Sequence, residues 1–123
     1  MDDLRIFAIH RDGSTVIVAP TGPISNLAAH EVQAEVDQII ALLQDDQWRN
    51  VVIDMEKVSF FGSVMLGAMH TFWKIVRRRE GRLVLCRLAD VGREIIHVAK
   101  FDTVWPIYAT RQEALEALKT PPS

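Results

Sequence analysis

Short runs of apolar and β-branched residues alternate with amphipathic stretches along this chain, and this alternation restricts the fold more than any single motif. Residue patterns predict strands over residues 4–10, 15–19, 51–55, 82–87 and 104–108. Apolar side chains spaced three to four residues apart predict helices over 26–44, 64–80 and 90–100, with a short helix after residue 110. Elements that alternate in this way form a mostly parallel sheet covered by helices. We therefore expect a single α/β domain with about five strands and about four helices.

The first two strands are predicted to depart from the parallel pattern. Asp12 and Gly13 lie between them, and an Asp-Gly pair is the strongest short signal for a tight hairpin. We therefore expect an antiparallel N-terminal hairpin at one edge of the mixed sheet. The runs 15–19 and 51–55 are almost continuously apolar, which is typical of strands buried on both faces. Pro106 lacks a backbone N–H, which places the last strand near an edge.

Helix boundaries are predicted from capping residues and glycine. The candidate N-terminal caps are Ser25 or Asn26 for the first helix, Ser63 for the second and Asp90 for the third. Residues 110–113 have the Thr-x-x-Glu pattern of a capping box, which predicts the start of the last helix. Gly81 is predicted to end the second helix in the left-handed conformation.

The apolar stripes predict which face of each helix is buried. They consist of Ala28, Val32, Val36, Ile39 and Leu43 in the first helix, Met65, Met69, Phe72 and Val76 in the second, and Val91, Ile95 and Val98 in the third. The apolar arc of the second helix is about twice as wide as that of an ordinary surface helix. Two interpretations stay open: the helix lies deep between neighbours, or its flank of Val64, Ala68 and Ile75 is exposed to a protein partner.

Length and composition limit the class of protein. The chain has 123 residues, which predicts one domain over residues 1–120 and a short flexible tail at 121–123. No apolar run approaches the roughly 18 residues of a membrane span, and the acidic start lacks the features of a signal peptide. The single cysteine, Cys86, excludes an internal disulfide and a cysteine-based zinc site. We therefore expect a cytoplasmic protein with no direct membrane insertion.

The sequence contains no pattern typical of catalysis or cofactor binding. The four histidines, His10, His30, His70 and His97, lack the spacing of a metal site, so we expect no metal ligand among them. Cys86 lies in a predicted buried strand, where a thiol is usually inert packing. Neither a nucleophile elbow nor a glycine-rich nucleotide loop is present. We therefore expect no enzymatic activity and no cofactor.

The formal net charge of −2 conceals an acidic half, residues 1–56, and a basic half, residues 57–123. The densest basic run, residues 77–79, lies on a predicted helix, where consecutive side chains point about 100° apart. These arginines therefore do not form one basic stripe, and no recognised nucleic-acid-binding motif accompanies them. We expect no binding to nucleic acid.

The segment 51–67 carries the most specific pattern in the chain. It reads as an apolar strand, then Asp54-Met55, a short link, Val58-Ser59-Phe60, and a glycine- and serine-containing start of a helix. This order resembles the signature of STAS domains, the bacterial anti-sigma factor antagonists. Further similarity extends over nearly the whole chain, in segments 22–25, 81–85, 101–104 and 113–115.

This sequence departs from the family pattern at the position that controls its function. In phosphorylated STAS proteins the second serine of an Asp-Ser-Ser motif accepts the phosphate, and that position corresponds to Val64. Gly62 replaces the aspartate, Met65 replaces a glycine, and Ser25 replaces an acidic residue. Ser63 keeps a hydroxyl one residue away. It is either a helix cap or a displaced phosphoacceptor.

The resemblance implies a non-enzymatic binding module that associates with an anti-sigma factor or a related serine kinase-like protein. The predicted partner surface consists of Ser59, Phe61, Gly62, Ser63, Val64, Met65, Gly67, Ala68 and Ile75, with Gly22 and Ser25 in a nearby loop. We expect a monomer or a weak homodimer. The alternatives are a non-phosphorylated STAS subunit of a signalling scaffold or of an ABC transporter complex, and a nucleotide or small-molecule binder that holds phosphate at the second helix.

Overall fold

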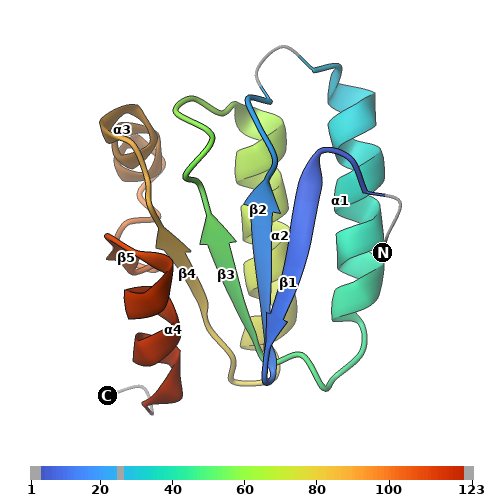
Figure 1. Ribbon diagram of the computed structural model, residues 1–123, viewed down its shortest axis with the longest axis vertical. Helices are drawn as coiled ribbons and strands as arrows, with labels where there is room; N and C mark the ends of the chain where they lie inside the picture. The colour runs from blue at the N-terminus through green and yellow to red at the C-terminus, as the bar shows by residue number, and fades with distance from the viewer. Residues whose placement is uncertain (1–3, 25–26, 121–123) are drawn as a thin grey trace.

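The computed structural model describes residues 4–24 and 27–120 and contains one five-stranded sheet with four α-helices (Figure 1). The predicted tail at 121–123 and the candidate caps Ser25 and Asn26 lie outside the described residues. The elements follow the order β1 (Phe7–Asp12), β2 (Thr15–Pro20), α1 (Ala29–Leu43), β3 (Asn50–Asp54), α2 (Ser63–Arg77), β4 (Leu83–Cys86), α3 (Asp90–Val98), β5 (Ile107–Tyr108) and α4 (Arg111–Lys119).

The strands lie in the order β1-β2-β3-β4-β5, and only β1 runs antiparallel to its neighbour. This arrangement confirms the predicted mixed sheet with an N-terminal hairpin. Gly13 occupies the hairpin turn with a φ of +60°, a conformation that glycine adopts without strain. The last strand is shorter than predicted, because residues 104 and 105 turn back to the carbonyl of Phe101 before β5 begins.

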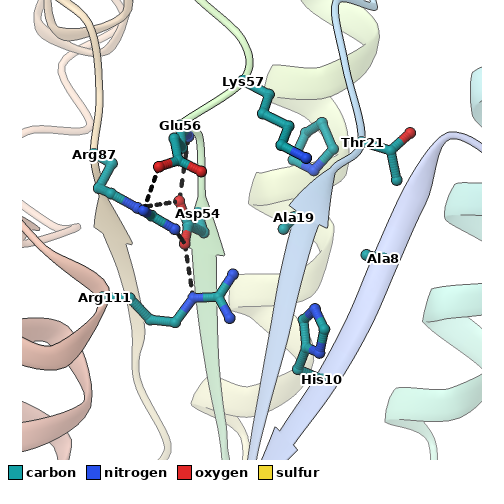
Figure 2. Close-up of a pocket in the computed structure, with 10 residues that line it drawn as sticks. Ala8, His10, Ala19, Thr21, Asp54, Glu56, Lys57, Arg87 and Arg111 are labelled. Carbon is teal, nitrogen blue, oxygen red and sulfur yellow. Dashed lines mark hydrogen bonds and ion pairs between the residues drawn. The ribbon is translucent and has the colours of Figure 1, made fainter.

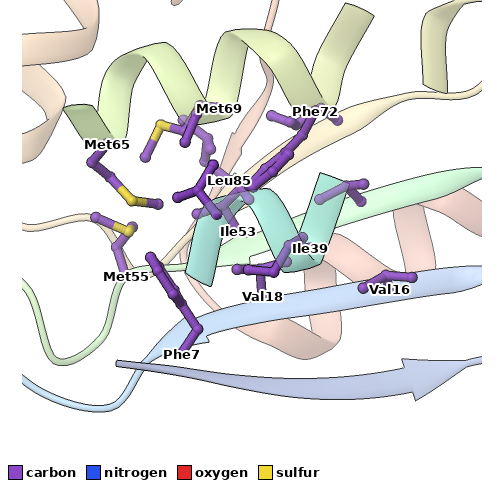
Figure 3. Close-up of a cluster of buried hydrophobic side chains, with 14 of the residues drawn as sticks. Phe7, Val16, Val18, Ile39, Ile53, Met55, Met65, Met69, Phe72 and Leu85 are labelled. Atoms are coloured by element: carbon purple, nitrogen blue, oxygen red, sulfur yellow. The ribbon is translucent and has the colours of Figure 1, made fainter. Parts of the chain in front are cut away.

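The main core lies between one face of the sheet and helices α1 and α2 (Figure 3). The strands contribute Phe7, Val16, Val18, Val51, Ile53, Leu83 and Leu85 to it. The predicted inner stripe of α2, namely Met65, Met69, Phe72 and Val76, is fully buried and confirmed. Every residue of β3 is buried, as expected for a central strand with cover on both faces.

The second face of the sheet is covered unevenly. Ala114 and Leu118 of α4 pack against Ile17, Val52, Val84 and Cys86. Helix α4 contacts β3, β4 and β5, and it lies beside the β4–β5 edge in Figure 1. The start of β1 and the end of β2, at the top of the hairpin in Figure 1, therefore have no helix over this face among the described elements. This uncovered area carries the pocket considered below.

Three of the predicted helix starts are wrong in detail. Helix α1 begins after Ala28, which is exposed and does not join the buried stripe. Ser63 and Asp90 are the first residues of α2 and α3, and neither helix has a side-chain cap bond at its N-cap residue. The capping residue of α4 is confirmed, because the Thr110 hydroxyl accepts a hydrogen bond from the Glu113 N–H at 3.0 Å.

Gly81 follows α2, but not in the predicted conformation. Glu80 takes the left-handed position, with a φ of 60°. The Gly81 N–H closes the helix by donating to the carbonyl of Val76 at 2.8 Å. A Cβ atom at residue 81 would lie 1.7 Å from the carbonyl oxygen of Arg49. Glycine is therefore required here by close backbone approach.

The predicted inner face of α3 is wrong for Val91 and Val98, whereas Ile95 is partly buried and packs against the main core. Val91 is 50% exposed and Val98 is 70% exposed, whereas Gly92 and Ile96 face the core. The reason is close packing at Gly92, where a Cβ would lie 2.9 Å from the Leu88 side chain and 3.3 Å from the Phe61 ring. No helix in the described part of the chain combines the length and apolarity needed to cross a bilayer.

Candidate functional site

The segment between β3 and α2 presents an exposed edge on a buried base. Met55, Val58 and Phe61 are buried in the main core. The Met55 N–H also donates to the Cys86 carbonyl at 3.0 Å, which fixes the start of the segment to β4. Ser59 and Phe60 project outward between these anchors. The segment therefore holds an exposed aromatic ring, 55% accessible at Phe60, on a rigid support.

The first turn of α2 continues this exposed edge. Gly62 is the N-cap residue in extended conformation, and its carbonyl accepts the Leu66 N–H at 3.1 Å. Ser63 follows it as an exposed first helical residue, and Val64 is half-buried. The backbone N–H groups of a first turn carry a partial positive charge. This turn contains no acidic residue that would neutralise it.

An open apolar pocket of about 220 Å³ lies between the starts of α1 and α2. Its lining consists of Ile24, Leu27, Ala29, Val32, Phe60, Gly62, Ser63, Val64 and Met65. None of these nine described residues is charged. Leu27, at 38% exposure, and Phe60 are among the large apolar side chains that the described surface exposes. An uncharged hollow with an aromatic rim is suited to hold apolar side chains of a protein partner.

The structure separates the residues of the predicted partner surface into an exposed group and a buried group. Ser59, Gly62, Ser63 and Gly67 are exposed, Val64 and Gly22 are partly exposed, and Ser25 lies outside the described residues. Phe61, Met65, Ala68 and Ile75 are buried. These four offer little side-chain surface to a partner in this structure, and they support the exposed residues from beneath.

The flank of α2 formed by Val64, Ala68 and Ile75 is mostly buried in the main core. Ala68 and Ile75 belong to the main core, and Val64 shares the pocket lining with Ala29 and Val32 of α1. The alternative of deep burial is therefore correct for most of this flank. Only its first residue, Val64, reaches the pocket.

Sequence reasoning placed the loop 59–62 in the partner surface but did not single out Phe60, and it did not include Leu27. The adjacent rings of Phe60 and Phe61 point to opposite sides, because consecutive side chains of an extended segment alternate. The signal was present in the Phe-Phe pair, but the pair alone did not show which ring faces outward. No periodicity in the sequence before α1 indicates that Leu27 is exposed.

A second cluster of functional side chains lies on the other face of the sheet, at the end of β3. Asp54 is 1% exposed, yet its carboxylate accepts hydrogen bonds from Arg87 Nε at 3.0 Å and Arg111 Nε at 2.7 Å (Figure 2). Arg87 also binds the carboxylate of Glu56. Burial by itself raises the pKa of Asp54, but the hydrogen bonds from both arginines outweigh it and hold that pKa below its ordinary value.

Cys86 lies beneath this cluster and is fully buried. Burial, reinforced by the Asp54 carboxylate, raises the pKa of its thiol to about 12. This confirms the prediction of a buried packing thiol. Within residues 4–24 and 27–120, no group of three or more His, Cys, Asp or Glu side chains is arranged to hold a metal ion.

The family model of the STAS domain matches residues 7–114, which is most of the chain. The chain belongs to the STAS domain family. This finding confirms the resemblance that the segment 51–67 indicates, and it agrees with the five-stranded sheet and four helices described above.

Relatives of this STAS domain include named antagonists. It is 29% identical over 105 residues to BtrV of Bordetella bronchiseptica, whose name describes an anti-sigma factor antagonist; the match covers 85% of this chain and 87% of BtrV. A STAS domain protein of Planctomyces limnophilus, described as an anti-sigma-factor antagonist, has a TM-score of 0.77 at 28% identity, covering 93% and 98% of the two chains. The unphosphorylated form of SpoIIAA has the same fold, with a TM-score of 0.79, 18% identity and coverage of 92% and 96%.

Proposed function

We propose that this STAS domain is an anti-sigma factor antagonist that acts by binding, without catalysis, in the cytoplasm. The observation that carries the proposal is the uncharged pocket between α1 and α2, with Phe60 and Leu27 on its rim. The partner is an anti-sigma factor of the serine kinase-like class. The antagonist occupies the anti-sigma factor and so releases a sigma factor for transcription.

The physical basis of binding is burial of the exposed rim. Apolar surface contributes about 25 cal/mol for each Å² removed from water, and aromatic anchors at the centre of an interface dominate affinity. Phe60 is already held in place by the buried Met55, Val58 and Phe61, so little conformational entropy is lost when a partner covers it. The site docks as a rigid surface.

Regulation by phosphate is proposed at Ser63. Val64 has no hydroxyl, whereas Ser63 is exposed, and no hydrogen bond within the described residues engages its side chain. A phosphate there carries about −1.5 to −2 charges. The first-turn N–H groups of α2 would stabilise this charge without unfolding the domain. The same charge would oppose burial of the uncharged pocket by a partner.

Phosphopeptide mass spectrometry after incubation with the serine kinase-like partner and ATP tests this regulation. We expect label on the peptide that contains Ser63 and none in Ser63→Ala. Label on another residue contradicts the assignment. So does the absence of label on this protein when the same kinase phosphorylates its control substrate. The binding function itself is tested separately, since binding does not require phosphate transfer.

Displacement of a sigma factor tests the function directly. A fluorescent sigma factor bound to its anti-sigma factor should lose anisotropy when this protein is added in excess. Phe60→Ala should displace much less, and Ala34→Glu, on the exposed side of α1, should act like the native protein. The test is repeated with each kinase-like anti-sigma factor of the source genome. If the sigma factor stays bound to its anti-sigma factor in every case at excess antagonist, the proposal is wrong.

A second candidate function is supported by the exposed face of α3. Val91 and Val98 place apolar surface on a helix outside the pocket, which suits a subunit of a signalling scaffold or of an ABC transporter complex. Such a subunit would need no phosphoacceptor at residue 64. Sedimentation velocity distinguishes the two: a scaffold subunit self-associates with concentration, and an antagonist sediments as a monomer or a weak dimer.

A further inference from the structure

A hollow of about 130 Å³ lies on the uncovered half of the second sheet face. Ala8 and Ala19 oppose each other in the β1–β2 register, and both line the hollow. Two small side chains in opposed positions leave space that larger residues would fill. The volume is roughly ten times the ~10–15 Å³ that one water requires, so a tetrahedral oxyanion fits.

Besides Arg87, three nitrogen-bearing side chains line this hollow from three different parts of the chain. Figure 2 shows Lys57, from the β3–α2 segment, extending toward β2, and Arg111, from the start of α4, directing its terminal nitrogens toward β2. In the same view, Ala19 lies between Lys57 and the His10 ring of β1. The three side chains thus frame one small volume.

Both carboxylates in the lining are already neutralised. Arg87 binds Asp54 and Glu56 together, and Arg111 adds a third contact to Asp54. Arg111 makes this contact through Nε alone. Its two terminal nitrogens, and the Lys57 ammonium, have no hydrogen-bond or ion-pair partner among the described residues. Within the described part of the chain, the hollow therefore keeps free hydrogen-bond donors on Arg111 and Lys57, while its two carboxylates are already paired.

We propose that this pocket, framed by Lys57, Arg111 and His10, binds a phosphate group supplied by free phosphate or by a mononucleotide. A guanidinium fork and an ammonium are the donors that phosphate oxygens prefer. Asp54 positions the Arg111 fork in advance, which lowers the entropy lost on binding. The site lies on the other face of the sheet from the apolar pocket, so it does not rest on the proposed function.

Amide NMR titration with inorganic phosphate tests the site, with sodium chloride holding the ionic strength constant. We expect saturable shifts at His10, Thr21, Lys57 and Arg111, with a dissociation constant of about 1 mM or tighter. Lys57→Gln should weaken binding about tenfold, because it removes one charged donor. Lys74→Gln, an exposed lysine of α2, is the matched control and should leave binding unchanged.

Several outcomes overturn the proposal. Shifts that rise linearly with phosphate, or equal affinity in the native protein and Lys57→Gln, show that these donors form no site. Because Lys57 lies outside the Asp54 ion-pair network, its substitution should preserve the fold. Amide signals away from residue 57 that match those of the native protein verify this. If a glutamate-rich peptide shifts these signals and phosphate does not, the pocket binds an acidic partner and the phosphate proposal is wrong.

Parallel titrations with adenosine and guanosine monophosphates identify the source of the phosphate. Equal affinities for phosphate and both nucleotides assign the site to the phosphate group alone. Tighter binding of one nucleotide, with added shifts beyond the pocket lining, assigns it to that mononucleotide. Failure of both nucleotides and phosphate to saturate the signals contradicts the site and leaves the antagonist function unaffected.

Discussion

The Asp54 carboxylate and the Arg87 guanidinium form a two-point ion pair where β3 and β4 end side by side. Arg87 Nε donates to Asp54 Oδ1 at 3.0 Å, and an Nη nitrogen binds Oδ2. Arg87 follows Cys86, the register partner of Asp54, and takes a left-handed φ of 56°. That conformation costs about 1–2 kcal/mol in a non-glycine residue. The ion pair offsets this cost and fixes the ends of both strands.

Replacing Asp54 is expected to destabilise the fold and change its response to acid. Asp54→Asn leaves Arg111 without a carboxylate and Arg87 with Glu56 alone, and both arginines are about one-third exposed. We therefore expect a loss near the lower end of the roughly 3–5 kcal/mol seen when a buried pair is broken. Urea unfolding at pH 7 measures it. Asp46→Asn, on an exposed turn, is the control and should change stability by less than about 0.5 kcal/mol.

The lowered pKa of Asp54 sets the direction of the pH dependence. A carboxyl group whose folded pKa lies below its unfolded value stabilises the fold above the unfolded pKa. This contribution is lost as the pH falls from about 4 through the folded pKa. The native protein should therefore lose stability in acid more steeply than Asp54→Asn. Equal acid slopes for both proteins would contradict the ionised pair.

Two glycines should respond oppositely to alanine. Gly81→Ala forces a Cβ against the Arg49 carbonyl at 1.7 Å, so we expect a loss of about 1–3 kcal/mol or more. Gly67→Ala adds a Cβ in open space within α2 and should stabilise the fold by about 0.5–1 kcal/mol. Thermal unfolding of both variants measures the difference. A neutral Gly81→Ala would show that the backbones do not approach as described.

Cys86 should be unreactive in the folded protein. Its thiol is fully buried, and a pKa of about 12 leaves almost no thiolate at pH 8. Modification by an aromatic disulfide reagent should proceed only at the rate of unfolding and become fast in 6 M guanidinium chloride. Rapid labelling of the native protein would contradict the packing of β4 beneath α4.

The pKa of His97 depends on Asp102. A hydrogen bond of 2.7 Å joins His97 Nδ1 to the Asp102 carboxylate and raises the pKa of the imidazole. Asp102→Asn should lower that pKa in an NMR titration of the ring protons. Asp37→Asn, on α1, is the control and should leave the His97 titration unchanged. Because both groups of the pair reach solvent, added salt should reduce the difference.

The elements that could be predicted from the sequence are those fixed by local pattern. The hairpin at Asp12-Gly13, the capping box at Thr110 and the inner stripe of α2 each depend on residues close in the chain. The face of α3 could not be predicted in this way. Its apolar stripe indicated Val91 and Val98 as buried, but contact of Gly92 with Phe61 turns that stripe outward.

The charged cluster was beyond sequence reasoning for a different reason. Arg87 and Arg111 lie 33 and 57 residues from Asp54, and only the parallel order of the strands brings them together. At the apolar pocket, the segment 59–64 located the start of α2 to within one residue. It did not show that Ala68 and Ile75 are buried in the main core, or that Phe60 and Leu27 form the rim of the pocket.

Calorimetric titration of the native protein and Phe60→Ala with a serine kinase-like anti-sigma factor of the source genome tests the central claim most directly. Phe60 is largely exposed, so its replacement should leave unfolding within about 0.5 kcal/mol of native. We predict that affinity falls about tenfold or more in Phe60→Ala, that Val64→Glu abolishes binding, and that Ala34→Glu binds like the native protein. Native affinity in both Phe60→Ala and Val64→Glu would contradict the assignment of the partner surface to the start of α2.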